Sequence, residues 1–172
     1  MIRTLVLAAA IASAPLLAVQ AQPAPSPGDT HAFIFKAAQT DEFERREGRL
    51  AENRARDPAV RRFAAQMVSD HTRTTEGLKA AMRRAGMAPP PPPALSSDQQ
   101  RMMSDLGAKN GRDFDRTYID QQVRVHEAAE GVIGGYAQSG PRGPIREAAR
   151  QTLPIVQHHL GMAQDLQRRL GG

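Results

Sequence analysis

Three histidines and one glutamate occupy interior positions of four separate predicted helices. Each lies on an apolar stripe that repeats every three or four residues, as on the buried face of an α-helix; the four are Glu44, His71, His126 and His159. Counted from the predicted turns at about 1.5 Å per residue, their heights agree to within roughly 5 Å. Imidazole and carboxylate groups that meet inside a bundle suit iron, zinc, copper or manganese. The spacing therefore predicts a metal site for one transition-metal ion.

The same residues also fit a buried polar network that holds no ion. A single interior histidine is more often a hydrogen-bonded core residue than a metal ligand, whereas four polar groups at one height favour a shared site. The polar side chains expected around the four are Glu47, Asp70, Asp115, Tyr118 and Gln122. The residue types leave both interpretations open, and they identify no catalytic residue. His158 is expected to point outward, away from the site.

Periodic apolar positions predict four long helices, over residues 30–55, 58–85, 113–138 and 144–169, and a short helix over 98–108. Asp57 and Pro58 suit the cap and first turn of the second helix. The predicted inward face of the first helix reads Ile34, Ala37, Asp41, Glu44, Gly48, Ala51 and Ala55. An aromatic content of 4% with abundant alanine favours closely packed helices over strands. The expected fold is all-α, an up-down four-helix bundle.

A proline-rich segment separates the second long helix from the short one. Residues 87–97 contain five consecutive prolines, Pro89 to Pro93. Such a run adopts extended polyproline II structure, which acts as a semi-rigid spacer. We therefore expect a crossover that carries the chain across or along the bundle.

The N-terminus has the pattern of an export signal. A basic residue, Arg3, precedes an apolar run from Leu5 to Val19, and Val19-Gln20-Ala21 suits a signal peptidase. The expected organisation is a signal peptide over 1–21, a disordered spacer over 22–29 and a bundle domain over 30–170, with the mature chain in the periplasm. An uncleaved N-terminal anchor is the alternative.

Charge and composition limit the classes of partner. The formal net charge is +5, but basic and acidic residues alternate, as on a solvated helix face. We expect no nucleic-acid partner and no stable membrane insertion after cleavage, whereas an envelope protein or a second copy of the chain remains an open partner. The chain has no cysteine, so an exported domain would fold without disulfides.

Three motifs resemble the DUF4142 family of exported bacterial proteins. They are Phe63 to His71 (FAAQMVSDH), Phe114 to Tyr118 (FDRTY) with His126, and Leu153-Pro154 with His159-Leu160. The resemblance extends over about residues 33–170, and it implies a ferritin-like bundle of unassigned activity. The resemblance also implies that a set of seven polar residues is important: Glu44, Asp70, His71, Asp115, Tyr118, His126 and His159.

The chain departs from ferritin-like di-iron proteins, which carry Glu-x-x-His on two helices. The residues three positions before the interior histidines are Val68, Val123 and Val156. One ion or none therefore fits better than two bridged irons. Three functions follow as hypotheses: a small metal-binding or envelope-stress-related protein, a non-catalytic interaction or structural protein, and a redox enzyme with one metal. Nucleotide-binding and phosphate-loop motifs are absent from the sequence.

Overall fold

The computed structural model describes residues 27–171, which form five helices and, within that range, no strand. The helices are α1 (Pro27–Arg54), α2 (Pro58–Arg84), α3 (Ser97–Ala108), α4 (Gly111–Ser139) and α5 (Pro144–Gly171). The predicted all-α bundle with a short extra helix is confirmed. Helix α1 begins three residues before the expected start, inside the segment predicted as a spacer. The predicted signal peptide and the rest of that spacer lie outside the described residues.

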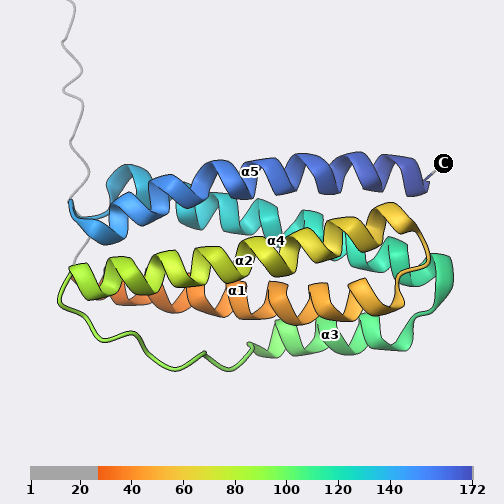
Figure 1. Ribbon diagram of the computed structural model, residues 1–172, viewed down its shortest axis with the longest axis horizontal. Coiled ribbons are helices and arrows are strands. Elements are labelled where there is room, and N and C mark those ends of the chain that lie inside the picture. The colour runs from red at the N-terminus through yellow and green to blue at the C-terminus, as the bar shows by residue number, and fades with distance from the viewer. Residues whose placement is uncertain (1–26, 172) are drawn as a thin grey trace, which may run out of the picture.

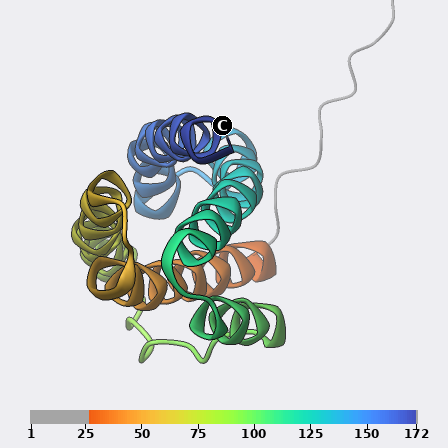
Figure 2. The same ribbon diagram turned by 90° about the vertical axis from the view of Figure 1, so that its right-hand side faces the viewer.

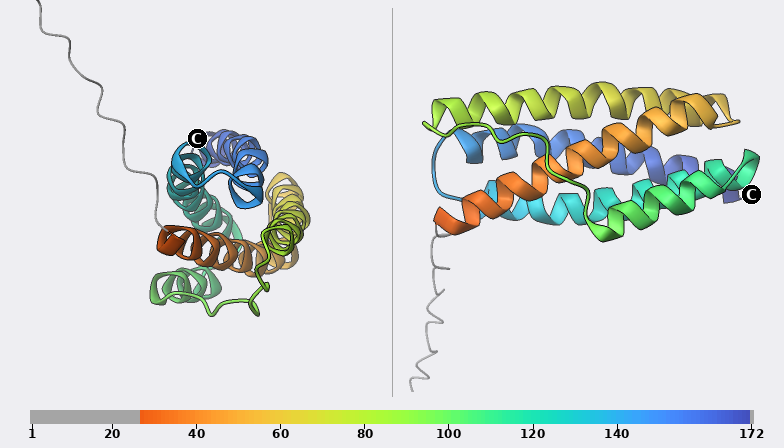
Figure 3. Two further views of the ribbon diagram at one scale, coloured as in Figure 1. Left: turned by 90° about the vertical axis from the view of Figure 1, so that its left-hand side faces the viewer. Right: turned by 90° about the horizontal axis from the view of Figure 1, so that it is seen from below.

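The four long helices form the bundle, and α3 lies on its outside against α4 and α1 (Figures 1 and 2). Neighbouring long helices run antiparallel, in the spatial order α1, α2, α5, α4. The crossover between α2 and α3 passes over α1 (Figure 3). Together with α3 it returns the chain to the end of the bundle where α2 begins, so α2 and α4 run in the same direction (Figure 1). The prolines of the crossover line a pocket of about 70 Å³ together with Ile34, Leu78 and Met82, and Gln39 Nε2 donates a hydrogen bond to Ala94 O at 2.8 Å. None of the helices within residues 27–171 is long and apolar enough to span a membrane.

The turns are held by local side-chain bonds. Asp57 accepts a hydrogen bond from the backbone N–H of Ala59, and Pro58 follows as the first residue of α2. Ser96 and Gln99 form a reciprocal capping box at the start of α3. Gly86 ends α2 with a positive φ of 72°, a conformation that glycine adopts without steric cost.

The core consists of two apolar clusters with buried polar side chains between them. One cluster surrounds the α1–α2 turn and includes Phe63, Phe114 and Leu166. The other lies toward the opposite end, where Phe33 stacks on Tyr136 with ring centroids 4.0 Å apart. The four long helices therefore hold the polar groups at mid-height, away from either end of the bundle.

Gly48 allows α1 and α2 to pack closely. A Cβ atom at this position would lie 2.9 Å from Val68 Cγ2 and 3.1 Å from Ala64 O. We expect Gly48→Leu to lower the free energy of unfolding by about 1–3 kcal/mol, because overpacking forces the two helices apart. Gly77→Leu is the matched control, since a Cβ there meets nothing within 4 Å. It should be neutral or stabilising by about 0.5–1 kcal/mol through helix propensity. Equal urea midpoints for the two variants would contradict the close approach.

Candidate metal centre

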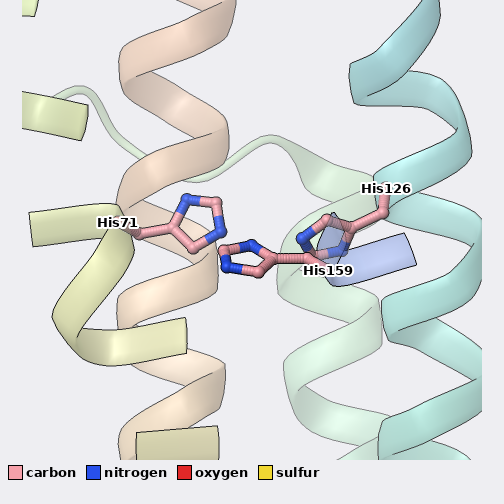
Figure 4. Close-up of side chains that lie close together, drawn as sticks. All are labelled: His71, His126 and His159. Atoms are coloured by element: carbon pink, nitrogen blue, oxygen red, sulfur yellow. The ribbon is translucent and has the colours of Figure 1, made fainter. Parts of the chain in front are cut away.

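Three histidine side chains from three helices converge in the bundle interior (Figure 4). His71 comes from α2, His126 from α4 and His159 from α5, and their exposed fractions are 4%, 1% and 0%. The ring centroids lie 5.4–5.7 Å apart, and one ring nitrogen from each lies within 4.8 Å of those of the other two. Three nitrogens on one tetrahedral zinc ion lie about 3.3 Å apart. A slight inward movement of the rings would therefore allow all three to bind one ion.

Each ring uses its other nitrogen to bind a protein oxygen. His71 Nδ1 lies 2.8 Å from Asp41 Oδ1, and His159 Nε2 lies 2.8 Å from Asp70 Oδ2. His126 Nδ1 lies 2.9 Å from the backbone oxygen of Gln122. Because ionised carboxylates and carbonyls only accept hydrogen bonds, the histidine N–H must donate in each pair. In the neutral ring, the second nitrogen, which we call the inner nitrogen, then carries a lone pair.

The inner nitrogens have no hydrogen-bond partner. They are His71 Nε2, His126 Nε2 and His159 Nδ1, and all three are buried. Metal-bound histidines commonly donate their outer N–H to a carboxylate or a carbonyl, which fixes the tautomer and the ring orientation. The three histidines show this arrangement on every ring.

Asp41 and Asp70 are themselves held in place. The hydroxyl of Thr74 donates to Asp41 Oδ1 and that of Thr75 to Asp41 Oδ2, both at 3.0 Å. Asp70 pairs with Arg73 on the same helix. Although burial raises the pKa of Asp70, hydrogen bonds from His159 and Arg73 outweigh it and hold that pKa below its usual value. Asp70 is therefore ionised at neutral pH.

The three rings differ in basicity. Burial lowers the pKa of His126 to about 3 and that of His159 to about 4. Burial also acts to lower the pKa of His71, but the hydrogen bond and charge of Asp41, with the charges of Glu44 and Asp70, raise it above its usual value. Two rings are therefore neutral and ready to bind a cation, while His71, with its raised pKa, must release a proton more often before it binds.

Glu44, the fourth predicted ligand, lies beside the three histidines but outside the group whose ligand atoms lie within 4.8 Å of one another. Glu44 Oε1 is 3.8 Å from His126 Nδ1, and Glu44 Oε2 accepts a hydrogen bond of 2.6 Å from Gln122 Nε2. The same Nε2 atom donates to Glu47 Oε2 at 2.8 Å. Burial raises the pKa of Glu44 and, with the charge of Glu44, raises the pKa of Glu47 well above its usual value.

The remaining predicted neighbours have different positions. Asp70 and Gln122 bind histidines, as described above. Tyr118 is fully buried near Glu44 and Glu47, and its hydroxyl has no partner. Asp115 instead accepts hydrogen bonds from the backbone N–H groups of Arg56 and Asp57, at 2.9 and 2.8 Å, so it holds the α1–α2 turn. The predicted surface position of His158 is confirmed.

Asp41 was not among the predicted site residues. Its place on the predicted inward face of the first helix, one turn before Glu44, is the signal that could have identified it. An acidic residue at core spacing needs a buried partner, and helix α2 brings His71 to that position.

The arrangement can hold a cation, and a small cavity lies beside Asp41, the partner of His71. Three neutral imidazoles leave at least one coordination position open, as in zinc sites with three protein ligands. The cavity next to Asp41 and Thr74 has a volume of about 20 Å³. That volume accommodates about one water molecule.

Comparison with known proteins agrees with the fold. The family described as "Domain of unknown function (DUF4142)" matches residues 14–166. The structure is similar to a crystal structure of a DUF305 protein from Streptomyces coelicolor that is described as secreted. The two have a TM-score of 0.69 and 15% sequence identity, over 84% of this chain and 94% of that one. No curated protein matches the sequence. With most of its length matched, and with the three motifs noted in its sequence, the chain belongs to the DUF4142 family.

Proposed function

We propose that this protein binds one transition-metal ion through His71, His126 and His159. Two observations carry the proposal: His71, His126 and His159 each offer one ring nitrogen within 4.8 Å of those of the other two, and each ring has one buried nitrogen without a hydrogen-bond partner. A buried polar group without a partner costs about 1–3 kcal/mol. A single cation would satisfy all three nitrogens at once.

The alternative, a polar network without an ion, accounts for only one of the two ring nitrogens of each histidine. Asp41, Asp70 and the Gln122 carbonyl satisfy the outer nitrogens. Nothing in the described part of the chain satisfies the inner ones. A network selected for hydrogen bonding alone would be expected to pair both nitrogens of each ring, so the inner nitrogens favour an ion.

The ligand type favours zinc or copper, with iron next. Imidazole suits these ions, whereas manganese prefers oxygen ligands. The carboxylates of Asp41, Asp70 and Glu44 lie around the three rings and offset the charge of a divalent ion. Because the site is buried and the cavity beside Asp41 holds about one water, we propose metal holding rather than turnover of an organic substrate.

We propose that this binding takes place outside the cytoplasm. The N-terminal sequence pattern predicts cleavage after Ala21, and the structurally similar DUF305 protein is described as secreted. Residues 1–21 would then be a signal peptide, and the bundle would act in the periplasm on metal ions or in response to envelope stress.

The test is elemental analysis of the protein purified from the periplasm without a chelator. We expect about one equivalent of zinc, copper or iron per chain, and titration calorimetry of the stripped protein should restore one equivalent. A protein that carries no metal and binds none of these ions would contradict the proposal and favour a non-catalytic interaction protein.

The pH dependence of binding follows from the histidine pKa values. His126 and His159 stay neutral down to about pH 3–4, whereas the pKa of His71 is raised above 6.5. Binding must displace the His71 proton, so apparent affinity should fall about tenfold per pH unit below the pKa of His71. Calorimetry in buffers of different ionisation enthalpy should detect about one proton released. Affinity that is constant from pH 8 to pH 6 would contradict this assignment.

A further inference from the structure

A second group of unpartnered polar atoms lies next to the three histidines, between α1 and α4. Glu44, Glu47, Tyr118 and Gln122 are each 0% exposed. Each has one oxygen that is buried and without a hydrogen-bond partner: Glu44 Oε1, Glu47 Oε1, the Tyr118 hydroxyl and Gln122 Oε1. Buried polar atoms are paired in the large majority of cases, so four unpaired oxygens in one place require a cause.

The sequence spacing brings these four groups together. Glu44 and Glu47 are three residues apart on α1, and Tyr118 and Gln122 are four apart on α4, so each pair lies on one face of its helix. Gln122 Nε2 joins the pairs, since it donates to both carboxylates, at 2.6 and 2.8 Å. Burial raises the pKa of Tyr118 well above its usual value, and the charges of Glu44 and Glu47 raise it further. The phenol therefore lies near both carboxylates.

The carboxylates of this group have few hydrogen-bond and salt-bridge partners within residues 27–171. Two carboxylates share a single amide donor, and neither Glu44 nor Glu47 forms a salt bridge to a lysine or arginine within residues 27–171. Glu44 lies 3.8 Å from His126, a ring that burial keeps neutral, and the charge of Glu44 acts together with that of Asp41 to raise the pKa of His71. Burial and the charge of Glu44 raise the pKa of Glu47 well above its usual value, because two adjacent buried carboxylates cannot both be ionised without a cation. The pair therefore takes up either a proton or a cation.

We propose that Glu44, Glu47, Tyr118 and Gln122 form a second cation site, adjacent to the histidine site, for a divalent ion that prefers oxygen ligands. Two carboxylates and a phenol oxygen are hard ligands of the kind that manganese, magnesium and calcium take. The Gln122 amide, whose Nε2 faces both carboxylates, would turn over to offer its oxygen to the ion. The histidine site, in contrast, offers only nitrogen. The two sites would therefore select different ions, and Glu44 would lie between them.

The proposal can be tested with Mn²⁺ as the probe. The protein is first loaded with one equivalent of Zn²⁺ and then titrated with Mn²⁺, while electron paramagnetic resonance measures free Mn²⁺. We expect one further Mn²⁺ per chain. Glu47→Gln should weaken Mn²⁺ binding by at least about tenfold, because it removes a ligand charge, and should leave the Zn²⁺ equivalent in place. Tyr118→Phe, which removes only the hydroxyl, should weaken it by a smaller factor.

Glu52→Gln is the matched control, because Glu52 is an exposed glutamate on the same helix. It should bind Mn²⁺ like the unsubstituted protein, and circular dichroism should show unchanged helix content in all variants. His71→Ala separates the two sites, since it should lose Zn²⁺ and keep Mn²⁺. If the Zn²⁺-loaded protein binds no Mn²⁺, or if Glu47→Gln and Glu52→Gln bind it equally, the second site is excluded. If infrared spectroscopy detects a protonated carboxyl whose proton Mn²⁺ does not displace, Glu44 and Glu47 share a proton and do not bind a cation.

Discussion

Replacement of His71 by alanine should abolish stoichiometric metal binding. The ring supplies one of three inner nitrogens, and the remaining two would leave the ion with a pair of protein ligands in a buried site. We expect apparent affinity for Zn²⁺ to fall by at least about a thousandfold, since each lost ligand removes a large part of a binding free energy of about 10–16 kcal/mol. Elemental analysis after dialysis and competition with a chromophoric chelator would measure the loss.

His158→Ala is the control for this substitution. His158 directly precedes His159 but is exposed, so its removal should change neither metal content nor stability. His71→Ala should also lower the stability of the metal-free protein, because Asp41 would lose its buried partner at a cost of about 1–3 kcal/mol. If His71→Ala destabilises the protein but retains its metal, the histidines belong to a polar network and the proposed function is wrong.

Replacement of Asp41 by asparagine should weaken Zn²⁺ binding by about 10–100-fold without removing a ligand. Asp41 orients the His71 ring and raises its pKa, and loss of such outer partners commonly has an effect of this size. The affinity at pH 8 should fall because the ring becomes a weaker and less constrained ligand. The acid-side decline in affinity should move to lower pH, because His71 would lose the neighbour that raises its pKa.

The shift of the pH profile distinguishes positioning from a general loss of structure. Asp165→Asn is the matched control, since Asp165 is an exposed aspartate that pairs with Arg168 on the same helix, α5. It should leave both affinity and pH profile unchanged. An Asp41→Asn variant with reduced affinity but an unshifted profile would show that Asp41 acts through packing and not through the His71 proton.

Helical periodicity was sufficient to predict that the three histidine side chains point into the bundle at a common height. It did not predict all of their hydrogen-bond partners. Their inward phase and common height depend on long helices with clear turn signals, such as the Asp57 cap, and these features are local in sequence. The partners depend on helix rotation and side-chain length. Asp41 and Glu44 both lie on the inward face of α1, but Asp41 reaches His71 while Glu44 contacts Gln122.

Asp115 illustrates the same limit. It belongs to a motif that places it near Tyr118, yet its carboxylate accepts hydrogen bonds from Arg56 and Asp57 at the turn between two other helices. Arg56 and Asp57 lie 59 and 58 positions away from Asp115 in the chain. Sequence spacing within one helix carries no information about such a pairing, so the residue was expected at the site.

X-ray absorption spectroscopy of the Zn²⁺-loaded protein tests the central claim most directly. Binding by His71, His126 and His159 predicts three imidazole nitrogens at about 2.0–2.1 Å, with the multiple-scattering pattern of histidine, and loss of that pattern in His71→Ala. A zinc spectrum with only oxygen ligands, or with fewer than three imidazoles in the unsubstituted protein, would contradict the three-histidine site.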